Sequence, residues 1–167
     1  MSTLNVTLIV IHTLISIAAI LAGVPAVMDL FRSRASSGST WFFLITAILT
    51  SATGFILPLA GLTPAVIVAI IALVILAVVL IARTRLLAGA FWRWIYAVGM
   101  VASLYLLVFV AIAQAFGKVG VLHEAAPTAS EPPFTITQGL TLLFFVVLGL
   151  AAAVKFRPAV AGRYAAA

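Results

Sequence analysis

Apolar residues run through this chain in five long stretches, and polar residues gather in the short segments between them. The stretches cover residues 4–31, 41–60, 64–82, 91–116 and 135–154. Each approaches or exceeds the roughly 20 residues that an α-helix needs to cross a bilayer. Lipid offers no partner for a free backbone N–H or C=O group, so stretches of this kind must be helical. The pattern therefore predicts an all-α bundle of five transmembrane helices.

The division between the second and third stretches depends on the short segment 57–64. It holds Pro58, Gly61 and Pro64, which together end helices effectively. A single broken span would have to accommodate about forty apolar residues, too many for one crossing. We therefore expect a tight hairpin here. The longest segment expected to lack helix is 117–134, and loops of this length often carry function.

The composition places the whole chain in lipid. Of its 167 residues, 66% are hydrophobic and 7% are charged, whereas a soluble domain has about half and a quarter. One membrane domain over residues 1–167 is the natural division. The sequence has no cysteine, which excludes disulfides, iron–sulfur clusters and cysteine zinc sites. The net charge of +6 does not indicate nucleic acid, because the basic residues lie between apolar stretches.

The placement of charge predicts the orientation. Five crossings put eight of the nine basic residues on one side, namely Arg32, Arg34, Arg83, Arg85, Arg93, Lys155, Arg157 and Arg163. By the positive-inside rule that side is cytoplasmic, so the N-terminus is outside and the C-terminus is in the cytoplasm. The outer side carries Lys118, Glu124 and Glu131. In a bacterium this describes a multi-pass protein of the inner membrane.

Two of the predicted helices carry small and polar residues on one face. Ser16 lies four residues after His12 in the first, and Thr46, Thr50 and Thr53 follow one face of the second. Faces of this kind let membrane helices approach closely, and their hydroxyls hydrogen-bond across the contact. We interpret this polar stripe as a helix-packing surface inside the bundle.

His12 is the most unusual residue, because it lies roughly 12 Å inside the membrane, where ionisable groups are functional candidates. Gln114 and Lys118 share a helix face near the same outer side. With His123 they form a candidate ligand-binding set for a quinone or a haem b. Alternatively, His12 is a neutral histidine hydrogen-bonded to a hydroxyl on a neighbouring helix. Haem ligation by both histidines is disfavoured, because His123 falls in a predicted loop.

Several segments of the chain resemble a group of small, uncharacterised multi-pass membrane proteins of proteobacteria. They are residues 12–16, 50–55, 92–96, 104–105, 114–118 and 126–134. The resemblance implies a bacterial inner-membrane location and no particular activity. In that group a polar residue follows the Leu-Tyr pair and a histidine opens the third helix. Here Leu106 and Leu107 follow the pair and the segment 63–66 has no histidine, so a polar site typical of the group is depleted.

Three functions remain open at this stage. No catalytic, metal-binding or phosphate-binding motif is present, which favours a non-catalytic accessory or assembly subunit of a larger respiratory or photosynthetic membrane complex. Its partners would be lipids and other membrane subunits, or further copies of this chain. The second possible function is that of a small redox protein that binds quinone or haem through His12 and Gln114. The third is a homo-oligomeric transporter or channel, although no inverted repeat supports it.

Overall fold

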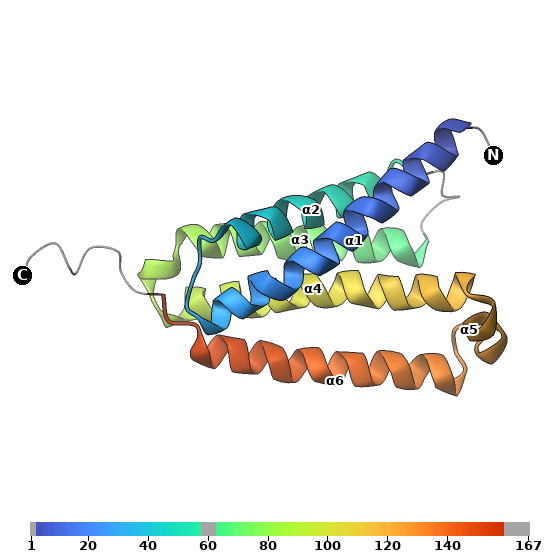
Figure 1. The fold of residues 1–167 in the computed structure, drawn as a ribbon. Helices are drawn as coiled ribbons and strands as arrows, with labels where there is room; N and C mark the ends of the chain where they lie inside the picture. The colour runs from blue at the N-terminus through green and yellow to red at the C-terminus, as the bar shows by residue number, and fades with distance from the viewer. Residues whose placement is uncertain (1–2, 58–62, 159–167) are drawn as a thin grey trace, which may run out of the picture.

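The computed structural model describes residues 3–57 and 63–158, and every regular element within them is helical (Figure 1). In chain order these are α1 (Thr3–Phe31), α2 (Gly38–Gly54), α3 (Pro64–Thr84), the 3₁₀ turn η1 (Leu86–Ala88), α4 (Ala90–Lys118), α5 (Gly120–Ala125) and α6 (Pro132–Lys155). The long helices run alternately in opposite directions, and short α5 lies at one end (Figure 1). The all-α class is confirmed.

Four helices are long and apolar enough to cross a membrane: α1, α3, α4 and α6. The chain is thus a membrane protein by the length and composition of its helices. The remaining long element, α2, has 17 residues and so measures about 25 Å, at the short end of what spans a bilayer. The fifth crossing and the orientation of the termini stay predictions.

Capping residues set the helix boundaries that hydropathy alone misplaces. α2 begins at Gly38, earlier than the predicted residue 41, because the Ser37 hydroxyl accepts a hydrogen bond from the Thr40 N–H at 3.1 Å. It ends at Gly54, and residues 55–57 follow as a turn and bend. The rest of the predicted second helix and most of the predicted hairpin, residues 58–62, lie outside the described residues. α3 begins at Pro64, as predicted, with Thr63 as its cap.

The predicted loop over residues 117–134 is largely wrong. α4 continues to Lys118, α5 occupies Gly120–Ala125, and α6 starts at Pro132 instead of residue 135. The Pro-Pro pair suggested an extended segment, but proline is favoured in the first turn of a helix, where its missing N–H needs no partner. Only short connections therefore separate α4, α5 and α6.

The core is concentrated in the half of the bundle where α1 ends and α4 begins. α4 is central and packs against α1, α3 and α6. All the buried residues of α1 lie between Ala19 and Leu30. Gly23 lets α1 approach α4 here, since a Cβ atom at this position would clash with Leu104. Beyond Ala19, toward its N-terminus, α1 has no fully buried residue, and Figure 1 shows it inclined across the other helices.

A cluster of polar contacts fixes this same end. The Arg83 guanidinium donates to the Ala35 carbonyl, to the Ser36 hydroxyl at 3.0 Å and to the Tyr96 hydroxyl at 3.2 Å. It also lies 4.4 Å from the centre of the Trp41 ring. The contacts join the end of α3 to α4 and to the α1–α2 connection. We call this the basic end, because the helix ends that carry most of the basic residues meet there (Figure 1).

Candidate ligand-binding cavity

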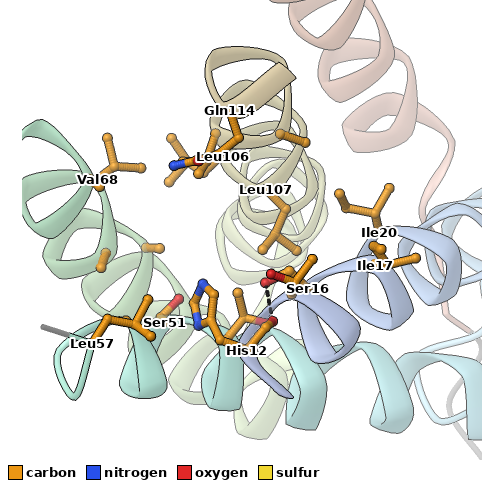
Figure 2. A pocket seen from close by; sticks show the side chains of 18 of the residues that line it. His12, Ser16, Ile17, Ile20, Ser51, Leu57, Val68, Leu106, Leu107 and Gln114 are labelled. Atoms are coloured by element: carbon orange, nitrogen blue, oxygen red, sulfur yellow. Dashed lines mark hydrogen bonds between the residues drawn. The ribbon is translucent and has the colours of Figure 1, made fainter. Parts of the chain in front are cut away.

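A cavity of about 600 Å³ lies between α1, α2, α3 and α4, in the half of the bundle away from the basic end (Figure 2). It exists where α1 no longer packs against the core. Most of its wall is aliphatic, with Val68, Leu106 and Leu107 among the residues that face it. The polar side chains that line it are His12, Thr13, Ser16, Thr50, Ser51, Gln114 and Lys118. An apolar pocket with a few convergent polar groups is typical of a small-molecule site.

His12 both anchors a helix contact and lines the cavity. Its Nδ1 atom lies 2.8 Å from the Oγ1 atom of Thr53 on α2. The hydrogen bond to a hydroxyl on a neighbouring helix, which the alternative interpretation of His12 predicted, is therefore present. The same ring is only half-buried and forms part of the cavity wall. The packing contact holds the ring in place, so the two roles are compatible.

The hydroxyls of the predicted polar stripe have different surroundings. Thr46 is buried and donates to the Phe42 carbonyl at 2.7 Å, within its own helix. Ser16 donates to the His12 carbonyl at 2.7 Å and lines the cavity. Thr50 also lines the cavity and is 8% exposed, yet its hydroxyl has no hydrogen-bond partner within the described part of the chain. A buried hydroxyl without a partner at a cavity wall is often completed by a bound molecule.

Gln114 and Lys118 line the cavity from the C-terminal end of α4, as their spacing on one helix face suggested. The structure therefore brings three of the four candidate ligand-binding residues to one place: His12, Gln114 and Lys118. His123 is exposed on α5 and does not line the cavity. The cavity wall offers a single imidazole, so the arrangement gives no support to haem ligation by both histidines. No group of three His, Cys, Asp or Glu residues that could hold a metal occurs in residues 3–57 and 63–158.

Sequence reasoning missed the contribution of α3. This helix has a span without a polar side chain, and its Ala65, Ala69 and Ala72 line the cavity together with Gly54 of α2. Their spacing of four and three residues puts the alanines on one helix face. That spacing was a readable signal, because small side chains on one face leave space beside them.

No protein-family model, curated protein or solved structure matches this chain. The geometry of the cavity therefore carries the functional argument.

Proposed function

We propose that this chain is a multi-pass protein of a bacterial inner membrane that binds a small amphipathic molecule in the cavity. The observation that carries the proposal is a cavity of about 600 Å³ whose aliphatic walls meet His12, Gln114 and Lys118 near one end. A polar head group would sit at these side chains. An apolar tail would lie along Leu106 and Leu107 and continue into the surrounding lipid, which is also apolar.

The proposed orientation places the cavity in the outer half of the membrane. Five crossings bring the basic end to the cytoplasmic face, in agreement with the positive-inside rule. The alternate direction of the long helices in Figure 1 supports this count. The N-terminus and α5 would then lie outside, and a ligand would enter from the outer leaflet.

Among the functions that the sequence left open, the cavity favours ligand binding. An accessory subunit does not need a cavity, so the cavity does not favour that role, which stays a prediction. Its partners would be membrane subunits or further copies of the chain. A channel needs a polar path through both halves of the bundle. Here Tyr96, Met100 and Leu104 fill the interior of the basic half and are at most 4% exposed. A quinone-type molecule, with a polar ring and a long tail, matches the cavity best.

Native mass spectrometry of protein extracted gently from its own membranes tests the proposal. We expect one small amphipathic molecule per chain, and we expect its loss in an Ala69→Phe variant, because Ala69 lines the cavity. Ile70→Phe is the matched control, since the neighbouring Ile70 is 44% exposed and is not part of the cavity wall. A wild-type chain that carries nothing, or equal retention in both variants, would contradict the proposal.

A further inference from the structure

The hydrogen bonds around Thr53 determine which nitrogen of His12 carries the proton. A threonine hydroxyl has one proton to donate. The Thr53 Oγ1 atom lies 2.7 Å from the Leu49 carbonyl oxygen and 2.8 Å from His12 Nδ1. Two oxygen atoms at 2.7 Å without a proton between them repel each other, so the hydroxyl proton points to Leu49. Thr53 must then accept its second hydrogen bond from a protonated Nδ1 of His12.

The consequence is an unprotonated Nε2 atom on the cavity side of the ring. In the neutral imidazole one nitrogen is a donor and the other an acceptor. With Nδ1 bound to Thr53, Nε2 is the acceptor, and no described residue donates a hydrogen bond to it. Figure 2 shows the His12 ring projecting into the cavity, toward the side on which Leu106 and Gln114 lie.

The hydroxyls beside His12 on α1 reinforce this polarity. Ser16 donates its proton to the His12 carbonyl at 2.7 Å, and Thr13 donates to the Ile9 carbonyl at 2.8 Å. Both side chains line the cavity, and both can offer it only oxygen lone pairs. The α1 wall therefore accepts hydrogen bonds and supplies no donor. The donors lie elsewhere in the cavity: Gln114 and Lys118 are on the opposite wall formed by α4, and the unpartnered Thr50 hydroxyl is on α2.

We propose that the cavity selects amphiphiles whose head group bears a hydroxyl, of the phenol or hydroquinone class, over their ether or carbonyl counterparts. A hydroxyl can donate to His12 Nε2 and at the same time accept from the α4 wall, whereas an ether or carbonyl cannot donate. The inference rests on the proposed ligand-binding function and adds the chemical class. A quinone would bind in its reduced form in preference to its oxidised form.

The state of the His12 ring is tested without any ligand. The chain has two histidines, so ¹⁵N-histidine labelling and an His123→Gln variant assign the His12 nitrogen resonances. We expect a neutral ring protonated at Nδ1 in the wild type. We expect mixed tautomers in Thr53→Val, which keeps the side-chain shape and removes the acceptor. A wild-type ring protonated at Nε2 would overturn the inference.

A matched pair of probes tests the selectivity. 4-Decylphenol and 4-decylanisole differ in the single hydrogen-bond donor, and both enter membranes. We expect the phenol to bind roughly 5- to 10-fold more tightly, the usual effect of one hydrogen bond. The preference should disappear in His12→Phe and shrink in Thr53→Val.

The outcomes of the probe experiment separate the two proposals. Equal affinity for both probes, with both lost in Ala69→Phe, would overturn the selectivity and leave the binding function intact. Binding of neither probe, or binding that Ala69→Phe does not affect, would overturn both. Tighter binding of the anisole would overturn the selectivity directly.

Discussion

At the scale of single residues, two glycines of the bundle differ sharply in the space around them. A Cβ atom at Gly99 on α4 would lie 2.5 Å from Cγ2 of Val79 on α3. Val79 is fully buried and its β-branched side chain has one strongly preferred rotamer in a helix. A Cβ atom at Gly149 on α6 would lie 3.6 Å from Val101, an ordinary contact. The contact between α3 and α4 thus depends on the missing side chain.

This difference predicts unequal effects of alanine. Gly99→Ala should lower the free energy of unfolding by about 1–3 kcal/mol, the usual cost of overpacking a core. Gly149→Ala should leave it nearly unchanged and serves as the control. Thermal unfolding in detergent, followed by fluorescence of the three tryptophans, measures both. Equal unfolding midpoints for the two variants would contradict the prediction, because the α3–α4 contact would then accommodate the added methyl group without loss of stability.

The residue scale also shows how far the candidate site could be predicted. The depth of His12 and the shared face of Gln114 and Lys118 were readable from spacing. The spacing did not show which hydroxyl forms a hydrogen bond with His12, because that depends on how α1 crosses α2. Thr50 and Thr53 occupy the same predicted stripe, yet Thr53 bonds to His12 and Thr50 has no partner within the described residues.

At the scale of elements, Arg83 joins α3 to its neighbours through hydrogen bonds to Ala35, Ser36 and Tyr96. Arg83→Met keeps the alkyl chain and removes these donors, which leaves the fully buried Tyr96 without its Arg83 donor. We expect a loss of about 1–3 kcal/mol in the free energy of unfolding.

Arg85→Met is the matched control for this prediction. Arg85 is exposed and lies 4.9 Å from the Trp92 ring centre, and the described residues give its side chain no hydrogen bond. Chemical unfolding of both variants in detergent compares them. An Arg83→Met protein as stable as Arg85→Met would contradict the role assigned to the cluster.

The connection between α5 and α6 has a contact that depends on pH. The Glu131 carboxylate accepts hydrogen bonds from the Thr128 hydroxyl at 2.7 Å and from the backbone N–H groups of Thr128 and Ser130, each at 3.1 Å. These bonds lower the pKa of Glu131 below its ordinary value, and the bond from the Thr128 side chain contributes most. Because the pKa is lowered, the ionised carboxylate stabilises the turn at pH values above the ordinary glutamate pKa. This stabilisation is lost as the pH falls through the lowered pKa.

We therefore expect the amide resonances of Thr128 and Ser130 to titrate with a midpoint below the ordinary glutamate value of about 4.3. NMR spectroscopy of the labelled protein in detergent measures the midpoint. In Glu131→Gln the same resonances should not titrate. A wild-type midpoint at or above the ordinary value would mean that the carboxylate gains nothing from the turn.

The elements themselves were mostly predictable, and the errors have physical causes. Long apolar stretches fix α1, α3, α4 and α6, because lipid tolerates no other backbone structure there. Hydropathy does not detect caps, so the start of α2 at Gly38, which Ser37 caps, was misplaced. It also cannot detect α5, a six-residue helix without a buried residue, or the use of Pro132 to begin α6.

At the scale of the whole molecule, the proposed five-span arrangement depends on α2. If α2 crosses the membrane, the α1–α2 connection and the α3–α4 connection are on the same side. If the 17-residue α2 does not cross, the two connections are on opposite sides. The position of the cavity in the outer leaflet, and hence the route of the ligand, depends on the first arrangement.

Labelling of single cysteines with a membrane-impermeant maleimide in intact cells tests this most directly, since the natural chain has no cysteine. Gly38→Cys and Leu87→Cys probe the two connections, and Thr3→Cys and Gly120→Cys probe the opposite end; all four positions are exposed. Five crossings predict that residues 3 and 120 react in intact cells, whereas residues 38 and 87 react only after the membrane is opened. Reaction of residue 87 but not residue 38 in intact cells would contradict the five-span bundle.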